Sequence, residues 1–139
     1  AGWAPSFVCC GVVLSGSCGL DGGAGSVTVW MQSEASVDLY YNDDASKLIL
    51  NGYMPLDIYM QKNINAVTLN VKINGEEVYK KIFNSSEVFQ IEIPIDTLER
   101  QGDSMHIELS TDYDFIPKKW GISEDERNLS YIINSIKQE

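Results

Sequence analysis

Hydrophobic and polar residues alternate in short runs along most of the chain after residue 26, and turn-forming residues separate the runs. A period of two is typical of half-buried β-strands, and no long stretch has the period of an amphipathic helix. The expected strands lie at 26–32, 36–42, 47–54, 66–73, 76–83, 88–95, 104–111 and 127–136. About eight strands of this length predict an all-β protein, an antiparallel β-sandwich of the immunoglobulin or jelly-roll kind.

The clearest local signal is a hairpin turn at Asn74 and Gly75. This dipeptide adopts the positive backbone angles of a two-residue type I′ turn. Such a turn predicts the cross-strand pairs Val71 with Val78, Val67 with Ile82, Lys72 with Glu77, and Leu69 with Lys80. The last pair places a lysine on the apolar face, which fits a strand near a sheet edge where the ammonium reaches water.

Two later runs have distinct inward and outward faces. The residues expected to face the core are Phe89, Ile91, Ile93, Ile95, Met105, Ile107 and Leu109. Pro94 limits its strand to an edge or a strand end, because proline cannot donate to a strand ladder. Between these runs, residues 96–103 are expected to form a short helical turn that ends at Gly102. His106 is expected to point outward.

Composition divides the chain at about residue 26. Seven of the eleven glycines and all three cysteines precede that point, where Asp21 is the only charged residue. We therefore expect a Gly- and Cys-rich segment at 1–25, followed by one β-sandwich domain at 26–139.

The net charge of the chain is −10. This charge repels nucleic-acid phosphates and anionic lipid surfaces alike. The longest apolar run, at 7–14, is far shorter than a membrane-spanning helix. Neither binding to nucleic acid nor insertion into a membrane is therefore expected.

Cys9, Cys10 and Cys18 admit two interpretations. Neighbours on an extended chain point in opposite directions, so one of the two adjacent cysteines can form a disulfide with Cys18 and leave an odd thiol. Alternatively, all three are reduced and packed as small hydrophobic residues. Three thiolates without a fourth ligand make a poor zinc site, and neither a metal nor a cofactor is expected.

The sequence contains no evident catalytic machinery. His106 has no neighbouring serine or cysteine motif, and there is no phosphate-binding loop. We therefore expect a binding or structural protein and not an enzyme. Asp112 and Asp114 flank Tyr113 at a spacing that suits a divalent cation or sugar hydroxyls, although acidic loop residues in an acidic protein are commonly only solvated.

Aromatic residues outside the core alternation are further candidates. Aromatic rings stack on sugar rings, while carboxylates and amides bind sugar hydroxyls. The candidates are Trp120, Tyr113, Tyr53 and Tyr59. For Trp120 the alternative is structural, because the residue precedes Gly121 in a turn and can cap the open end of the sandwich. Asp125 and Arg127, two residues apart, can form an ion pair that fixes the turn into the last strand.

Residues 47–136 resemble an accessory domain found beside glycosyltransferase and methyltransferase domains in bacterial cell-surface polysaccharide proteins. The similarity is carried by LILNGYMP, the VTLNVKINGEEV hairpin, the FQIEIPI strand and the ending DFIPKKWGISEDERNLSYIINSI. The resemblance implies a sandwich like those of carbohydrate-binding modules, with a glycan-related, non-enzymatic role at the cell surface or outside the cell. It also implies a glycan or polysaccharide partner and an associated transferase domain.

The segment at 1–25, which the resemblance does not cover, supports a hypothesis of a different class. Its run at 6–14 has the length and β-propensity to pair with a sheet edge, in its own subunit or in an identical neighbour, as in donor-strand assembly. The chain would then be a self-assembling extracellular surface or filament subunit. The simpler alternative is a first strand of the same sandwich.

Overall fold

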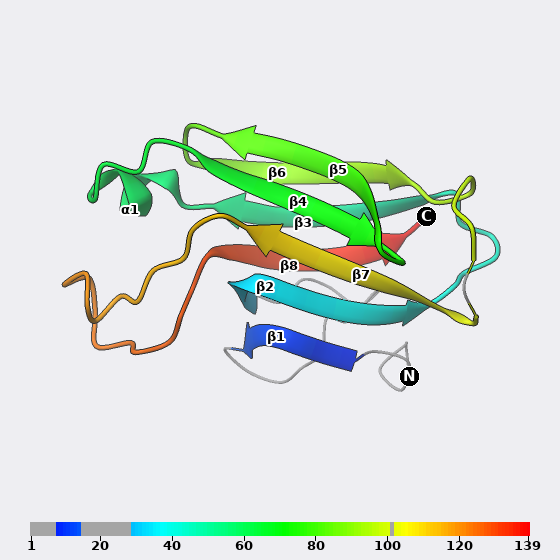
Figure 1. Ribbon diagram of the computed structural model, residues 1–139, viewed down its shortest axis with the longest axis horizontal. Helices are drawn as coiled ribbons and strands as arrows, with labels where there is room; N and C mark the ends of the chain where they lie inside the picture. The colour runs from blue at the N-terminus through cyan, green and yellow to red at the C-terminus, as the bar shows by residue number, and fades with distance from the viewer. Residues whose placement is uncertain (1–7, 15–28, 101) are drawn as a thin grey trace.

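The computed structural model describes residues 29–100 and 102–139, together with the backbone of residues 8–14. This part of the chain contains eight strands and one short helix (Figure 1). In chain order they are β1 (Val8–Leu14), β2 (Val29–Tyr40), β3 (Lys47–Met54), α1 (Leu56–Met60), β4 (Val67–Ile73), β5 (Glu76–Phe83), β6 (Glu87–Pro94), β7 (Ser104–Thr111) and β8 (Tyr131–Gln138). The protein is an all-β, antiparallel β-sandwich, as the alternation predicts.

The strands form two packed leaves that share β2. The hydrogen-bonded order is β5-β4-β7-β2-β8-β3-β6, with β1 paired to β2. β2 pairs with β7 through residues 34–40 and with β8 through residues 29–31, so the path folds over at β2. We call β5, β4, β7 and the second half of β2 the first leaf, and β6, β3, β8 and the first half of β2 the second leaf. Figure 1 shows the first leaf in front of the second.

The prediction of separate strands at 26–32 and 36–42 was wrong, because β2 is one continuous strand. A single strand of 12 residues runs through both of those segments. The three residues between the two predicted strands, Ser33, Glu34 and Ala35, include no glycine or proline that would reverse the chain. They therefore stay extended, and β2 passes from the second leaf to the first.

The hydrophobic core fills the space between the inner faces of the two leaves. Along β4 and β7 every second side chain is buried, as a period of two requires. All the residues predicted to face the core from the two later runs are buried, namely Phe89, Ile91, Ile93, Ile95, Met105, Ile107 and Leu109. Burial of each such side chain favours folding by about 1.5–3 kcal/mol before the cost in conformational entropy. In β4, β6 and β7 the alternation therefore predicts which face turns outward.

The β4–β5 hairpin has the predicted turn but not the predicted register. Asn74 and Gly75 have φ angles of 52° and 85°, as a type I′ turn requires. Lys72 pairs with Glu77 as predicted, and a β-bulge then shifts the pairing by one residue. The observed pairs beyond the bulge are Val71 with Tyr79, Leu69 with Lys81, and Val67 with Phe83. The predicted partners Val78, Lys80 and Ile82 were wrong, and the shift buries the phenyl ring at the end of β5.

The edge strands β5 and β6 meet at the open side of the sandwich. The rings of Phe83 and Phe89 lie 5.4 Å apart between their centroids. Lys81 lies over the ring of Phe83, and its Nζ is 2.9 Å from Oε1 of Glu87. A lysine on the inner side of an edge strand thus reaches water at the rim, the behaviour that the sequence predicted for its neighbour Lys80.

Two connections differ from prediction. The described part of 96–103 contains a hydrogen-bonded turn, in which the Leu98 N–H donates to the Ile95 carbonyl at 3.3 Å, and no helix. Gly102 does have a positive φ of 87°. The helix α1 was not predicted, because five residues are too few to show a helical period. Among the described residues, no helix has the length and apolarity needed to cross a membrane.

β1 pairs antiparallel with β2 of its own chain. Residues 8–10 lie opposite 36–38, and residues 12–14 lie opposite 29–31, with a register shift between the two stretches. This backbone arrangement is that of a first strand of the same sandwich. Cys9 and Cys10 belong to β1, but their side chains and Cys18 lie outside the described residues, so both interpretations of the cysteines stay predictions.

Candidate functional site

Trp120, the leading aromatic candidate from the sequence, packs against the core at one end of the sandwich. Its ring centroid lies 5.6 Å from that of Phe115 and 6.1 Å from that of Tyr59. The ammonium of Lys62 lies over the indole, 5.9 Å from the ring centroid. These contacts make the indole part of the packing that closes this end of the molecule.

Tyr59 on α1 is fully buried, and its hydroxyl begins a network at the same end of the sandwich. The hydroxyl donates to the Ser130 carbonyl at 2.8 Å. The Ser130 hydroxyl donates to the Tyr113 carbonyl at 2.8 Å and lies 2.7 Å from the hydroxyl of Thr111. Burial raises the pKa of Tyr59 far above its usual value, so the phenol remains a neutral donor. The network ties α1 to the end of β7 and the start of β8.

The two carboxylates around Tyr113 have different hydrogen-bond partners. Asp112 Oδ1 accepts the backbone N–H of Thr68 at 2.9 Å, and Asp114 Oδ2 accepts the hydroxyl of Ser33 at 3.3 Å. Tyr113 itself is exposed. Within the residues that the structure describes, no group of three His, Cys, Asp or Glu side chains is placed to hold a metal ion.

Tyr53 lies on a different surface, the outer face of the second leaf. It is paired there with Val88 of β6 and Ile132 of β8, while its neighbours Gly52 and Met54 are buried. The structure therefore distributes the carbohydrate-binding candidates from the sequence over two surfaces.

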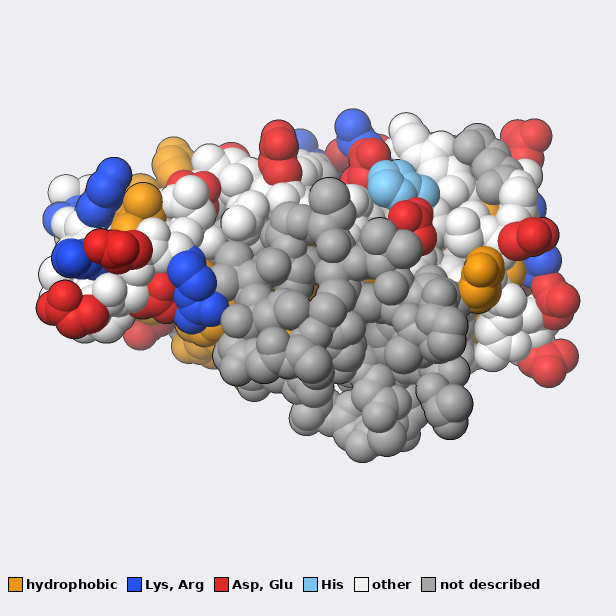
Figure 2. All heavy atoms as spheres, turned by 90° about the horizontal axis from the view of Figure 1, so that it is seen from below, with side chains coloured by type: hydrophobic (Ala, Val, Ile, Leu, Met, Phe, Trp, Pro, Cys, Tyr) orange, Lys and Arg blue, Asp and Glu red, His pale blue; other side chains and the backbone are white. Residues whose placement is uncertain are grey.

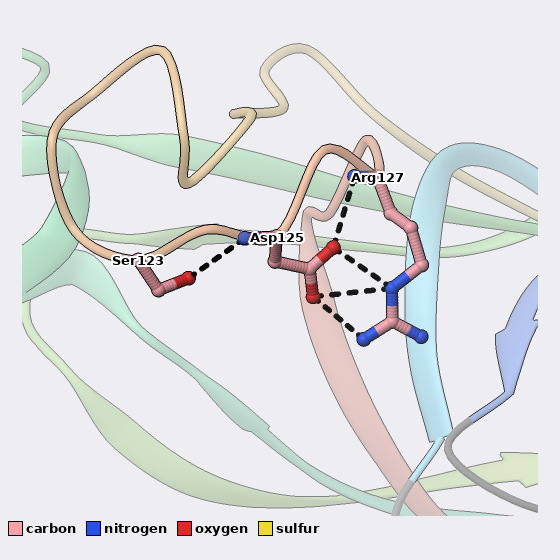
Figure 3. A network of polar contacts seen from close by, with 3 residues as sticks. All are labelled: Ser123, Asp125 and Arg127. Atoms are coloured by element: carbon pink, nitrogen blue, oxygen red, sulfur yellow. Dashed lines mark hydrogen bonds and ion pairs between the residues drawn. The ribbon is translucent and has the colours of Figure 1, made fainter.

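Asp125 and Arg127 are in contact in the loop before β8 (Figure 3). The guanidinium donates from Nε to Oδ1 at 3.0 Å and from Nη2 to Oδ2 at 2.7 Å, and the backbone N–H of Arg127 donates to Oδ1 at 2.9 Å. These hydrogen bonds lower the pKa of Asp125 to about 2. The Asp125 N–H also donates to the Ser123 hydroxyl at 3.2 Å, so the whole arrangement closes a local turn.

A groove of about 430 Å³ crosses the outer face of the first leaf, and we call it the β2–β7 groove. Its polar side chains come from β2, β4 and β7, and they are Glu34, Ser36, Lys72, His106, Glu108 and Ser110. They face outward because the residues between them point into the core. The strand register places three pairs side by side: Glu34 with Ser110, Ser36 with Glu108, and Lys72 with Glu108.

His106 lies between two carboxylates on this face. Its ring Nδ1–H donates to Asp38 Oδ1 at 2.6 Å, and its Nε2 is 3.3 Å from Glu108 Oε1. The pKa of His106 is raised above its usual value, mainly because Asp38 accepts this hydrogen bond. Figure 2 shows the imidazole in pale blue with acidic side chains in red beside it. Both ring nitrogens therefore face carboxylates.

One exposed aromatic residue extends this surface along β2. Tyr40 has the same outward parity as Glu34, Ser36 and Asp38, and it pairs with Ser104 of β7. At 57% exposure it is the most exposed aromatic side chain of the described residues. The row from residue 34 to residue 40 spans roughly 20 Å at about 3.3 Å per residue. The surface is thus long enough for an extended ligand and ends at an aromatic ring.

The groove suits binding better than nucleophilic chemistry. In a serine–histidine–aspartate arrangement, the ring nitrogen that does not face the aspartate faces a hydroxyl. In this groove that nitrogen, Nε2 of His106, faces the carboxylate of Glu108. The arrangement instead offers hydroxyl, carboxylate, imidazole and ammonium groups to a polar ligand.

Sequence reasoning placed His106 on the outer face but did not find the groove. The signal that could have found it is the outward alternation of 34–40, in which carboxylates and a hydroxyl precede a tyrosine. To locate the groove from that signal, one would also have to know that β2 pairs with β7. These strands are separated by more than sixty positions in the chain.

No family model matches the sequence, and a search of curated proteins finds no match. Among solved structures, the chain is similar to a family 35 carbohydrate binding module from Clostridium thermocellum. The TM-score is 0.44 and the identity 10%, over 96% of this chain and 94% of that chain. It is also similar to the CBM36-1 domain of a multidomain xylanase from the hindgut metagenome of Trinervitermes trinervoides. There the TM-score is 0.40 and the identity 14%, over 93% and 94% of the two chains.

A third similar structure contains the CBM51-2 and INT domains of Clostridium perfringens ZmpB. The TM-score is 0.39 and the identity 12%, over 78% of this chain and 22% of that chain.

Proposed function

We propose that the protein is a non-catalytic carbohydrate-binding β-sandwich and that its glycan lies along the β2–β7 groove. The observation that carries the proposal is the combination of groups on one outer face. Serine hydroxyls, carboxylates and an imidazole line the groove, and the exposed ring of Tyr40 lies beyond it on the same row. Sugars are bound by this division of labour, in which polar groups meet hydroxyls and a ring meets the apolar face of the sugar.

The shape of the site favours an oligosaccharide over a single sugar. The polar row spans roughly 20 Å along β2, so that several sugar units would contact it in succession. The hydroxyls of Ser36 and Ser110 form no hydrogen bond with the described residues, so they are available to a ligand. A preformed sheet face also costs little entropy to order on binding.

A second location for the glycan follows from the sequence and is a competing proposal. It would use Tyr113 and Trp120 at the end of the sandwich, with Asp112 and Asp114, or Tyr53 on the second leaf. The contacts of Trp120 and the hydrogen bonds of the two aspartates favour the groove, because these groups already serve the fold. Tyr113 is the member of this set that keeps an exposed ring.

The test compares two exposed tyrosines. A glycan array with the full chain would identify a ligand, and calorimetry would then measure its binding to the parent, Tyr40→Ala and Tyr113→Ala. We expect Tyr40→Ala to weaken binding by about 1–3 kcal/mol, as for an aromatic residue at a binding hot spot, and Tyr113→Ala to leave it unchanged. The reverse result would move the site to the end of the sandwich, and an array without any bound glycan would refute the proposal.

The non-catalytic part of the proposal has its own test. It is supported by the orientation of His106 toward Glu108, which leaves the ring no hydroxyl to activate. We expect no turnover of any glycan that the array identifies. Hydrolysis or transfer by the isolated chain, abolished by His106→Gln, would show that the protein is an enzyme.

A narrower version of this function follows from the resemblance of residues 47–136 to accessory domains beside polysaccharide transferases. In this version the chain holds a surface polysaccharide near an associated transferase domain. Binding to the surface polysaccharide of the source organism, and to none of a panel of unrelated polysaccharides, is the expected result. Equal binding to all of them would contradict this version alone.

Self-assembly through the amino-terminal segment is the second candidate function. The observation that favours it is β1, an uncharged strand that, among the described residues, pairs only with β2. Such a strand can pair with β2 of an identical neighbour by the same hydrogen bonds. Deleting residues 1–25 would remove oligomers or filaments seen by electron microscopy with the intact chain. A monomeric intact chain would refute this candidate.

A further inference from the structure

We infer that the β2–β7 groove selects glycans that bear amino groups over N-acetylated glycans and rejects glycans that bear uronic acids. The inference rests on the proposed function and concerns the charge of the ligand.

Both cationic groups of the groove have carboxylates as neighbours, but only His106 is in contact with them. His106 contacts both Asp38 and Glu108. Lys72 lies opposite Glu108 of β7 and Glu77 of β5 in the strand register, and its ammonium forms no ion pair with the described residues. An anionic sugar would therefore have to compete with two carboxylates for His106, and it would approach Lys72 beside Glu77 and Glu108. Its own charge would also be repelled by a chain of net charge −10.

One carboxylate of the groove, that of Glu34, has no cationic residue opposite it in the strand register. Glu34 is exposed at the end of the groove, opposite Ser110, and its carboxylate forms no hydrogen bond or ion pair with the described residues. The adjacent hydroxyls of Ser36 and Ser110 are likewise available. A carboxylate between two hydroxyls can accept from a sugar ammonium while the serines bind the neighbouring hydroxyls.

The chemistry of this end favours an ammonium over an acetamide. A hydrogen bond between two charged groups is roughly twice as strong as one between neutral groups. N-acetylation removes the charge and adds bulk at the same position. The groove should therefore prefer a free amino sugar, with the amine at Glu34 and a later sugar ring at Tyr40.

The experiment compares chitosan and chitin oligosaccharides of equal length, together with an oligogalacturonate, by calorimetry at a pH where the sugar amine is protonated. We expect the chitosan oligosaccharide to bind about tenfold more tightly than its N-acetylated counterpart, and the oligogalacturonate not to bind. The variant Glu34→Gln should reduce that preference to about twofold. Its control, Glu124→Gln, removes the same charge at an exposed site in the loop before β8 and should leave the preference unchanged.

Equal reductions by Glu34→Gln and Glu124→Gln would show a general charge effect and overturn the inference. Tight, Tyr40-dependent binding of the chitin oligosaccharide or the oligogalacturonate would also overturn it, while leaving the proposed function standing. If these oligosaccharides and every glycan of the array fail to bind, both the inference and the proposed function are refuted.

Discussion

The loop end of the sandwich and the β2–β7 groove contain similar kinds of side chain, but the protein uses them differently. At the loop end, the hydroxyls of Tyr59 and Ser130 are bonded to backbone carbonyls. In the groove, the side chains of Glu34, Ser36 and Ser110 form no hydrogen bond in the described part of the chain. Polar groups bonded within the fold stabilise it, whereas unpaired groups on an outer face are available to a ligand. Residue type alone therefore does not distinguish the two uses.

The largest difference between the two regions is expected in the free energy of unfolding of two variants, each of which loses an aromatic ring. Trp120→Ala removes the contacts with Phe115 and Tyr59 and should destabilise the protein by about 2 kcal/mol. Tyr40→Ala removes an exposed ring and should change the free energy of unfolding by less than about 0.5 kcal/mol. Urea denaturation of both variants checks this. Equal losses would mean that Tyr40 also serves the fold.

A smaller contrast is expected between two buried tyrosines that lose only a hydroxyl. Tyr59→Phe removes the donor to the Ser130 carbonyl and should destabilise the protein by about 1–2 kcal/mol. The hydroxyl of Tyr131 is buried without a partner among the described residues, so Tyr131→Phe should be neutral or stabilising. Thermal melts of both variants measure the difference. A loss of stability in Tyr131→Phe would show that its hydroxyl has a partner in the folded protein.

The ion pair in the loop before β8 should contribute a still smaller, acid-sensitive stabilisation. The pKa of Asp125 is lowered from 3.8 to about 2 by the hydrogen bonds from Arg127. A lowered folded-state pKa means that the contribution is present above the unfolded value and is lost as the pH falls toward 2. Asp125→Asn should melt slightly below the parent at neutral pH, and the two melting temperatures should converge near pH 2. Identical melting at neutral pH would remove the structural role given to this pair.

The smallest effect on stability is expected when His106 is substituted, because its imidazole is half exposed and therefore well screened by solvent. Its pKa is raised by the hydrogen bond to Asp38 and by the nearby carboxylates. A raised folded-state pKa stabilises the protein below the unfolded value, and this contribution is lost as the pH rises through the folded value. The difference in melting temperature between the parent and His106→Gln should therefore be larger at about pH 5 than at about pH 9. A difference that grows with pH would contradict the ion pairs.

The strands could be predicted because a period of two is a local property. The buried faces of β6 and β7 and the turn at Asn74 and Gly75 follow from neighbouring residues alone. The register of β5 could not be predicted in this way. Its apolar alternation is interrupted by Lys80 and Lys81, and only the packing of Phe83 in the core shows which of two registers is adopted.

The candidate site was harder to predict because it depends on strands that are distant in sequence. The outward parity of Tyr40 is visible in the sequence, but its proximity to the row of His106 depends on the pairing of β2 with β7. The structural use of Trp120 depends likewise on α1, which carries Tyr59. Pairing between distant strands determines which side chains the fold leaves available to a ligand. Local sequence patterns do not show this pairing.

The most direct test of the central claim is a map of ligand contacts on the intact protein. Backbone amide shifts would be recorded by NMR during titration with a glycan identified on the array. We expect the largest shift changes at 34–40 and 104–110, on the strands that form the β2–β7 groove, and none at 112–130. Changes confined to 112–130 would contradict the account, because they would place the ligand on the side chains that we assign to the fold.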